Sequence, residues 1–253
     1  TYTNAGKVRN QGLEMSLHTI NLTGELGWET NVTATYNKNK IKDLNSAVPY
    51  YINQINNSYV TMLAKDYPIN AFYGYVTDGL FQNQAEVDAH AVQPGAEPGD
   101  IRFRDLNNDG VINDSDRTVI GNPNPSWFFS MNNNLSYKGF ELSVFLQGVA
   151  GNKIYNANNI DNVGMAAAYN QTTDVLNRWR GEGTSYFMPR AVFGDPNQNC
   201  RVSDRFVEDG SYLRVKNITL SYTFPKQWLQ KLQIENARLS LSCENVATIT
   251  GYS

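Results

Sequence analysis

The chain has 253 residues, of which 41% are hydrophobic and 18% are charged, and its formal net charge is −3. This length is enough for one large β domain or two ordinary domains, and the 15 Tyr, 11 Phe and 4 Trp favour strands. So weak a charge provides no basic field for nucleic acid, which excludes that class of partner. No apolar run approaches the ~18 residues of a membrane-spanning helix, which leaves open a transmembrane barrel, whose strands are only half apolar.

The first strand signal is GLEMSLHTINL, residues 12–22, in which Leu13, Met15 and Leu17 alternate with polar residues. A second alternating run follows at residues 26–37, after a short segment that contains glycine. The period of two predicts strands, and the short connection between them predicts a hairpin.

The same design returns twice along the chain. SWFFSMNNNLSYKGFELSVFLQG, residues 126–148, reverses at Lys138 and Gly139. A third hairpin pairs residues 217–224 with residues 237–243. Each of these strands carries aliphatic or aromatic residues on one face and mainly Asn, Ser, Thr or Gln on the other, so we expect three hairpins of one sheet.

Two long segments separate the hairpins, at about residues 45–126 and 149–210, whereas ordinary loops are about 4–6 residues long. Each segment follows an upward strand and precedes a downward one, so both leave an antiparallel meander at the edge opposite its short turns. Short turns on one side and long loops on the other are typical of an outer-membrane barrel. We therefore expect an all-β chain that forms about six strands of an antiparallel up-and-down transmembrane β-barrel, with two long extracellular loops.

The composition of the two strand faces supports the barrel. Amides and hydroxyls suit a confined polar lumen, whereas a soluble sandwich tends to present Lys and Glu to water. Aromatic residues near the short turns suit a girdle at the lipid interface; they are Trp28, Tyr137, Phe140, Tyr222 and Phe224. Six strands cannot close around a wide lumen, so we expect the chain to be a piece of a longer protein. The alternative is a soluble, calcium-stabilised β-sandwich module that binds carbohydrate.

DLNNDGVIND, residues 105–114, opens a calcium-loop register that ends at position 12 with Asp116. Side chains at positions 1, 3 and 5 converge on one point, and Gly110 at position 6 permits the sharp bend. The expected Ca²⁺ ligands are Asp105, Asn107, Asp109, the carbonyl of Val111, Asn113 and Asp116. The competing interpretation is a solvated Asx-turn loop. Because neither flank looks helical, we expect residues 105–116 to be a structural staple and not a switch.

Cysteine and histidine usage gives no sign of catalysis. Cys200 and Cys243 lie far apart without metal or redox spacing, so they are two free thiols or one disulfide. Only His18 and His90 are present, and neither sits in a constellation with Ser or Cys. GEGT, residues 181–184, lacks the lysine of a phosphate loop. We therefore expect no enzyme.

Four long stretches resemble one family of proteins. They are FYGYVTDGLFQNQAEVDAHA, PGDIRFRDLNNDGVINDSDRTVIGNPNPSWFFS, GFELSVFLQGVAGNKIYN and RVSDRFVEDGSYLRVKNITLSYTFP. They are similar to the C-terminal barrel portion of SusC/RagA-type TonB-linked outer-membrane proteins of Bacteroidetes. The resemblance implies a 22-stranded barrel with an N-terminal plug, placed in the cell outer membrane. It also implies TonB-energised import of oligosaccharides or peptides, together with a SusD-like surface lipoprotein. The plug and the TonB-contacting segment of that family have no counterpart in this sequence.

The two long segments would then contribute to an outer vestibule that contacts the lipoprotein and the substrate. Aromatic faces and amides suit sugar rings and hydroxyls, and the expected substrate contacts are Tyr155, Asn156, Trp179 and Tyr186. Further candidates of the same kind are Tyr73, Tyr75, Phe81, Asn158, Asn159 and Phe187. For each of them the competing interpretation is a packed loop residue or a member of the aromatic girdle.

Overall fold

The computed structural model describes residues 6–252. The chain forms two compact units, and each is described by itself. The sheet unit comprises Asn10–Asn39, Asn124–Asn152 and the chain from Asp209 onward, and the loop unit comprises Lys40–Pro123 and Lys153–Glu208 together with the start of the chain. No helix within the described residues combines the length and the apolar character needed to cross a bilayer.

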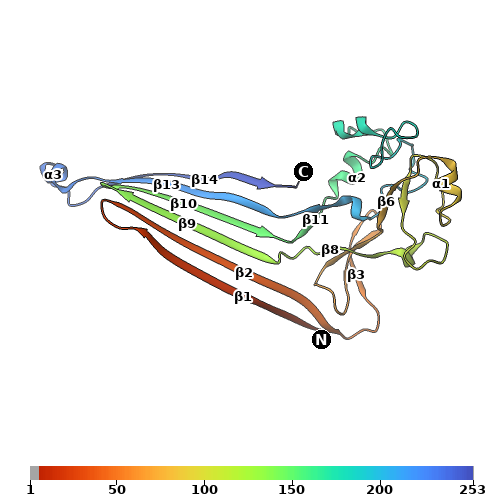
Figure 1. The fold of residues 1–253 in the computed structure, drawn as a ribbon, viewed down its shortest axis with the longest axis horizontal. Helices are drawn as coiled ribbons and strands as arrows, with labels where there is room; N and C mark the ends of the chain where they lie inside the picture. The colour runs from red at the N-terminus through yellow and green to blue at the C-terminus, as the bar shows by residue number, and fades with distance from the viewer. Residues whose placement is uncertain (1–5, 253) are drawn as a thin grey trace. The chain divides into compact units, whose positions relative to one another are not determined.

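A six-stranded sheet makes up the sheet unit, in the order β1-β2-β9-β10-β13-β14 (Figure 1). Its strands are β1 (Gly6–Leu22), β2 (Leu26–Leu44), β9 (Trp127–Tyr137), β10 (Phe140–Ala150), β13 (Tyr212–Thr223) and β14 (Arg238–Thr250). The pairs from β2 through β14 are antiparallel. This confirms the predicted all-β, antiparallel class.

Short connections join these strands at one end of the sheet. Lys138 and Gly139 both have positive φ, at 46° and 88°, as a two-residue hairpin turn that matches the strand twist requires. The connection between β13 and β14 holds the short helices α3 (Lys226–Leu229) and η4 (Gln230–Leu232). At the other end, Tyr36 pairs with Trp127 and Val149 pairs with Tyr212, so the long segments depart from a common end.

Several strands are longer than their alternation predicts, and β1 and β13 begin earlier, at Gly6 and Tyr212. β2 continues to Leu44 and β14 to Thr250, beyond the expected ends at residues 37 and 243. The residues added to β2 are KNKIKDL, residues 38–44, which lack an apolar face. Backbone pairing with a neighbouring strand extends a strand whatever its side chains are, so the hydrophobic pattern sets only a lower bound on strand length.

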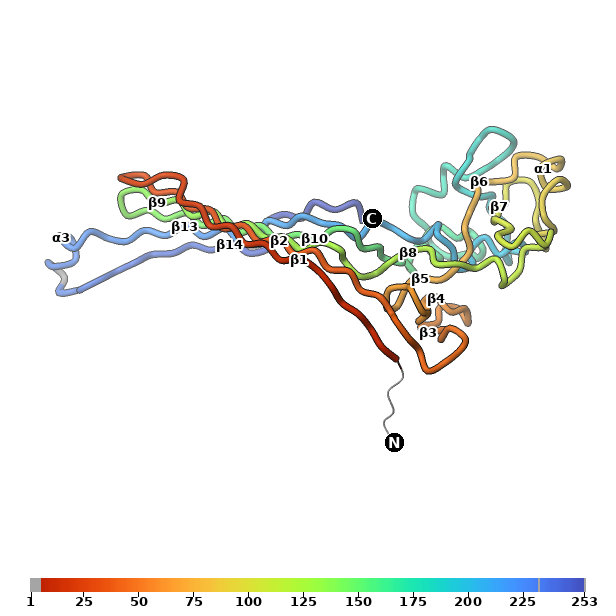
Figure 2. The backbone as a smooth tube through the Cα atoms, turned by 60° about the horizontal axis from the view of Figure 1, so that its bottom comes forward, coloured from red at the N-terminus to blue at the C-terminus, as the bar shows by residue number. Residues whose placement is uncertain are grey.

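The registers place the apolar residues of neighbouring strands on one face of the sheet. Trp28 pairs with Leu135, which pairs with Leu142, which pairs with Leu220, which pairs with Leu241. This face is not covered by protein, since Leu220 is 47% exposed and Leu241 is 75% exposed. Figure 1 shows the strands that carry it side by side, and in the turned view of Figure 2 the same strands overlap.

Thr30 and Asn133 interrupt the apolar face, and they satisfy their own polar groups. Asn133 Oδ1 accepts hydrogen bonds from Thr30 Oγ1 at 2.8 Å and from Trp28 Nε1 at 3.1 Å. Asn21 Nδ2 donates to Thr30 Oγ1 at 2.8 Å. Because these bonds are made within the sheet, the face presents few unsatisfied polar atoms to its surroundings.

The loop unit contains secondary structure of its own. Its strands are β3 (Tyr50–Ile55), β4 (Ser58–Leu63), β5 (Ala71–Gly74), β6 (Thr77–Leu80), β7 (Ile101–Phe103), β8 (Thr118–Gly121), β11 (Lys153–Tyr155) and β12 (Val207–Asp209). Its helices are α1 (Gln84–Asp88), η1 (Asp114–Asp116), α2 (Asn158–Asn162), η2 (Thr173–Asn177) and η3 (Asp204–Phe206). The sheets are β3-β4-β5-β8, β6-β7 and β11-β12. These strands are mostly too short for alternation to reveal them.

Two small apolar clusters form the core of the loop unit. One contains Ile160, Val163, Met165, Met188 and Phe206. The other contains Leu80, Ile101, Phe103 and Ile112, with Tyr75, Ala91 and Trp179 packed against it. Each cluster joins residues of distant sequence segments, so the core that anchors the candidate sites depends on tertiary contacts.

A buried polar network ties the two long segments of the loop unit together. Asp100 is fully buried and accepts from Arg190 Nε at 2.9 Å, from Arg190 Nη2 at 3.1 Å and from Asn199 Nδ2 at 2.9 Å. Asn199 Oδ1 in turn accepts from the backbone N–H of Ile101 at 2.7 Å and from Asn197 Nδ2 at 2.9 Å. The network fixes residues around 100 against residues 190–199, because every one of these buried groups would lose a partner on separation.

Candidate functional sites

The loop at residues 105–116 folds around its own polar side chains. The Asp105 carboxylate accepts from the backbone N–H of Gly110 at 2.8 Å and of Asp109 at 3.3 Å. Asn107 Nδ2 donates to Asp109 Oδ2 at 2.8 Å, and Asp109 Oδ1 accepts from the N–H of Val111 at 2.9 Å. The bond from Asn107, followed by that from Val111, lowers the pKa of Asp109, so this carboxylate stays ionised in mildly acidic solution.

The second half of the loop is a capped turn of 3-10 helix. Asn113 Oδ1 accepts from the N–H of Ser115 at 2.8 Å, and Asp116 Oδ2 accepts from the N–H of Asn113 at 2.8 Å. Asp116 Oδ1 accepts from the N–H of Leu106 at 2.9 Å, and the Asp116 side chain is fully buried. Asp116 therefore closes the loop onto its first turn.

The chemistry of the loop suits a hard cation more than a transition metal. In the part of the chain that the structure describes, no group of three or more His, Cys, Asp and Glu side chains is arranged to hold a metal. The expected Ca²⁺ ligands also include amide and carbonyl oxygens, which calcium accepts readily. Gly110 has φ +82° with open space around its Cα, as the bend at position 6 requires. The residue types and the bend of this loop therefore suit Ca²⁺, while the carboxylates of Asp105 and Asp116 bond to N–H groups of the loop itself in this structure.

A second site is a pocket of about 340 Å³ in the loop unit. Its lining consists of Thr77, Gly79, Leu80, Ile101, Tyr186, Phe187 and Arg205. Tyr186 and Phe187 are 65% and 71% exposed, and two such aromatic side chains in sequence form an accessible rim. Tyr186 was predicted as a substrate contact, and the structure places it at a pocket.

The other three predicted substrate contacts lie inside the loop unit. Tyr155 packs against Phe72 and Phe206, with ring centroids at 6.0 and 6.1 Å, and burial raises the pKa of its hydroxyl. Asn156 is buried, and its Nδ2 donates to Glu208 at 2.8 Å. Trp179 packs against the core and donates from Nε1 to Gln82 at 3.3 Å. Their positions favour packing over ligand contact, and the structure does not bring these three together with Tyr186 into one site.

The further candidates are similarly divided. Phe81 is fully buried, whereas Tyr73 lines a pocket of about 430 Å³ together with Tyr51, Tyr59, Asp114, Ser115 and Arg117. There the guanidinium of Arg117 lies over the Tyr73 ring at 4.5 Å. Tyr75 donates from its hydroxyl to Asp114 Oδ1 at 3.1 Å. On α2, Asn158 is exposed, and Asn159 donates from Nδ2 to Glu208 at 3.0 Å.

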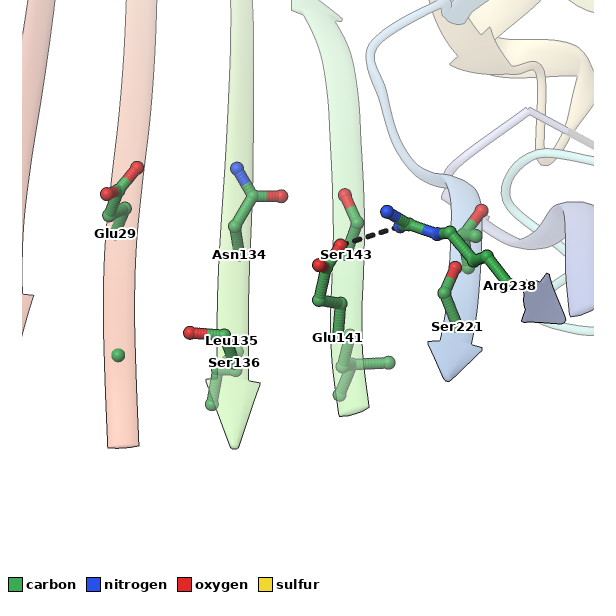
Figure 3. Close-up of a pocket in the computed structure, with 11 residues that line it drawn as sticks. Glu29, Asn134, Leu135, Ser136, Glu141, Ser143, Ser221 and Arg238 are labelled. Carbon is green, nitrogen blue, oxygen red and sulfur yellow. Dashed lines mark hydrogen bonds and ion pairs between the residues drawn. The ribbon is translucent and has the colours of Figure 1, made fainter. Parts of the chain in front are cut away.

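The polar face of the sheet unit carries a groove of about 460 Å³ (Figure 3). Figure 3 shows its side chains rising from neighbouring strands, among them Glu29, Asn134, Glu141 and Ser143. Arg238 Nη2 lies 2.6 Å from Glu141 Oε2, and both side chains are half exposed. The groove combines hydroxyls, amides and both signs of charge, as expected of a surface that faces water and polar solutes.

The two cysteines are free thiols, which decides between the alternatives left open by the sequence. Burial raises the pKa of Cys200 to about 12, so this thiol is protonated at neutral pH. A protonated, enclosed thiol is a poor nucleophile, and the structure gives Cys200 a packing role beside α2.

Known proteins match this chain over nearly its whole length. It is 32% identical to the TonB-dependent receptor P3 of Formosa agariphila over 98% of this chain and 25% of that receptor. It is 30% identical to the TonB-dependent receptor P26 of the same organism over 96% of this chain and 25% of that receptor. With the TonB-dependent receptor SusC of Bacteroides thetaiotaomicron the identity is 24%, over 98% of this chain and 24% of that receptor. No family model matches the sequence.

The fold matches a solved transporter structure. The structure of the RagAB peptide transporter superimposes with a TM-score of 0.80 at 21% identity, over 99% of this chain and 26% of that chain. The structure of the RagAB peptide importer in its closed-closed state gives a TM-score of 0.77 at 22% identity, over 99% of this chain and 27% of that chain. The relatives named here are receptors and transporters, not enzymes. The chain spans about a quarter of the length of the relatives it matches, and it is homologous to that part of the TonB-dependent receptors.

Proposed function

We propose that this chain forms part of the wall and the outer loops of an outer-membrane receptor that imports oligosaccharides or peptides. The energy would come through the TonB complex, and a SusD-like surface lipoprotein would close over the outer loops. The observation that carries this proposal is the uncovered apolar face of the sheet in a chain that is homologous to part of the TonB-dependent receptors. Neither catalysis nor nucleic-acid binding is part of the proposed role.

Lipid is the occupant that suits the apolar face. Aligned apolar residues run across the paired strands from Trp28 to Leu241, and soluble proteins rarely leave so continuous an apolar surface in water. Alternation of a lipid face with a polar lumen face is the pattern of membrane barrels. The alternative, a soluble carbohydrate-binding sandwich, needs a second protein layer over this face, and the exposed fractions of Leu220 and Leu241 give it no support.

Replacing Leu220 with Arg in the parent receptor is expected to impair its assembly into the outer membrane. A charged side chain on the lipid face of a barrel costs roughly 2–4 kcal/mol at the bilayer midplane. Folded receptor would be measured in the outer-membrane fraction by its resistance to unfolding in detergent on gels, with and without heating.

Thr219→Arg is the matched control, because Thr219 is the preceding residue of β13 and lines the polar groove. This variant should assemble at close to the unmodified level, since its side chain enters a wet, polar space. Equal assembly of the two variants would contradict a lipid contact at Leu220 and, with it, the membrane role of this sheet.

Calcium binding by residues 105–116 is a second part of the proposal. Asp105, Asn107, Asp109, the Val111 carbonyl, Asn113 and Asp116 would hold Ca²⁺ as a staple of the loop unit. β7 precedes this loop and β8 follows it. A helix pair that opens on binding is therefore not available here, which favours a structural ion over a signalling one.

Asp105→Ala is expected to weaken calcium binding by the parent receptor about tenfold or more, because it removes the charged ligand at position 1. Isothermal calorimetry with CaCl₂ measures the change. Asp88→Ala on α1 serves as the control, since Asp88 is exposed and its carboxylate accepts a hydrogen bond from Gln84, outside the loop. An unmodified receptor that takes up no calcium at millimolar concentration would remove this part of the proposal.

A further inference from the structure

Arg205 is a charged side chain at the wall of the pocket formed with Leu80, Ile101, Tyr186 and Phe187. Its guanidinium donates from Nη2 to the sulfur of Met188 at 3.3 Å, and its central carbon lies 5.5 Å from the centre of the Phe206 ring. Its Nη1 is enclosed and has no hydrogen-bond partner. A guanidinium offers five N–H donors and thioether sulfur is a weak acceptor, so most of the donor capacity of Arg205 is unused.

No carboxylate within residues 6–252 lies at ion-pair distance from Arg205. Its neighbour in sequence, Asp204, is already engaged, because Asp204 Oδ1 accepts from Thr77 Oγ1 at 2.7 Å and from the N–H of Thr77 at 3.0 Å. Arg190 in the same unit shows the contrast, with both Asp100 and Glu97 around it. Arg205 therefore lacks the ion-pair partner that a buried guanidinium normally has. The charge of Asp195, whose carboxylate accepts from the N–H groups of Asn199 and Cys200, acts on it only from beyond ion-pair distance.

An anion that enters the pocket would be stabilised by the charge of Arg205. Burial lowers the pKa of Arg205, although a guanidinium remains charged at any physiological pH. Desolvating a charge is costly unless an opposite charge and hydrogen bonds compensate. A carboxylate is the anion whose two oxygens match the fork of a guanidinium.

We infer that this pocket is a binding site for the C-terminal carboxylate of a peptide whose last residue is apolar. The carboxylate would pair with Arg205, and the terminal side chain would lie against Leu80 and Ile101, between the rings of Tyr186 and Phe187. At about 340 Å³ the pocket lies near the small end of ligand pockets, which span roughly 300–1,000 Å³. That size suits one terminal residue.

The lining favours a peptide over an acidic sugar. A sugar ring brings several hydroxyls, each of which needs a hydrogen-bond partner when it leaves water. Thr77 already uses its hydroxyl on Asp204, and Gly79, Leu80, Ile101 and Phe187 have no polar side-chain group to offer. Besides Arg205, the lining therefore offers a sugar the hydroxyl of Tyr186, too little for the several hydroxyls of a ring. An apolar terminal residue has no such requirement, and its burial gains hydrophobic free energy.

This inference rests on the proposed import function, because a ligand of the loop unit is a cargo only in a transporting receptor. Binding and import are therefore measured separately. The binding probe is N-acetyl-Ala-Ala-Leu with a free carboxylate, titrated by calorimetry into the detergent-solubilised parent receptor. The same peptide with a C-terminal amide and trigalacturonate are the comparison ligands.

The free acid is expected to bind at least tenfold more tightly than the amide. Arg205→Gln should reduce binding of the acid to the level of the amide. Arg205→Lys should bind the acid with intermediate affinity, because lysine keeps the positive charge but lacks the paired N–H donors of a guanidinium. Arg180→Gln is the matched control, since Arg180 is an exposed arginine of the same unit that does not line this pocket; it should bind the acid unchanged.

Arg205→Met tests the same point without a ligand. If the charge serves to bind a ligand, its removal should not weaken the loop unit of the ligand-free parent receptor. The resistance of this unit to proteolysis should then be unchanged or higher. A loss of resistance would assign Arg205 a structural role and overturn the inference. Equal binding of acid and amide, no binding of either, or unchanged binding by Arg205→Gln would overturn it as well.

Three outcomes distinguish this inference from an acidic-sugar site and from the import function. Binding of trigalacturonate that depends on Arg205, without binding of the peptide, would overturn the peptide and assign the pocket to an acidic sugar. Binding of the acid without its import by cells that carry the receptor would contradict the import function alone. Import of the acid without binding that depends on Arg205 would overturn the inference alone.

Discussion

Replacing Phe103 with Ala is expected to lower the free energy of unfolding of the loop unit by about 3–5 kcal/mol, the usual cost of truncating a fully buried Phe. Phe103 is fully buried in the cluster with Leu80, Ile101 and Ile112. Its ring also lies 5.6 Å from that of Tyr75 and 4.4 Å from the guanidinium carbon of Arg201. Truncation leaves a cavity that these neighbours, drawn from three segments of chain, cannot easily fill.

Hydrogen exchange in the parent receptor measures this effect. Exchange of the amides of Ile101 and Ile112 should accelerate by a factor of a hundred or more, since about 1.4 kcal/mol corresponds to tenfold. Phe193→Ala is the control, because the Phe193 side chain is 84% exposed and its loss should leave exchange unchanged. Similar exchange in both variants would show that the cluster around Phe103 does not stabilise the loop unit.

Asp100→Ala is expected to destabilise the loop unit by about 3 kcal/mol, at the lower end of the cost of breaking a buried ion pair by removing one partner. Asp100 holds Arg190 through two hydrogen bonds and also accepts from Asn199 and from the N–H of Glu97 at 3.0 Å. Glu97 remains 2.6 Å from Arg190 Nη1 in the variant. This second carboxylate limits the loss.

Limited proteolysis of the parent receptor reports the outcome. Cleavage between residues 190 and 199 should become faster in Asp100→Ala, because Asn199 loses the group that orients it. Asp78→Ala is the matched control, since Asp78 pairs with Arg102 and Arg104 at half-exposed positions. Exposed pairs contribute about 0–1 kcal/mol. Equal cleavage in the two variants would contradict a stabilising role of the buried network.

The hairpins of the sheet could be predicted because their cause is local. Leu135 and Leu142 recur at a period of two on either side of Lys138 and Gly139, and these two residues adopt the positive φ of a tight turn. Strand ends such as Leu44 and Thr250 could not be predicted, because they depend on backbone pairing with another strand. For the same reason β3, β4 and β5 were not predicted within the first long segment.

The candidate sites were predictable only in part. Residues 105–116 are one contiguous stretch, so spacing alone identifies the ligands expected of a calcium loop. Tyr155, Asn156 and Trp179 have side chains that suit a sugar, and the structure packs all three inside the loop unit. Arg205 was not predicted, because SDRFVED places carboxylates beside it in sequence, which suggests an ordinary ion pair.

The sequence by itself determined the two-faced antiparallel hairpins, the turn at Lys138 and Gly139, and the calcium-loop register, because each depends on residues within a few positions of one another. Only the tertiary structure decided which face neighbouring strands share, that Leu220 and Leu241 lie uncovered, and that Asp204 turns to Thr77 and leaves Arg205 without an ion-pair partner. Those outcomes depend on contacts between separate segments of the chain, up to 127 positions apart for Thr77 and Asp204, where burial and pairing are set by the whole fold.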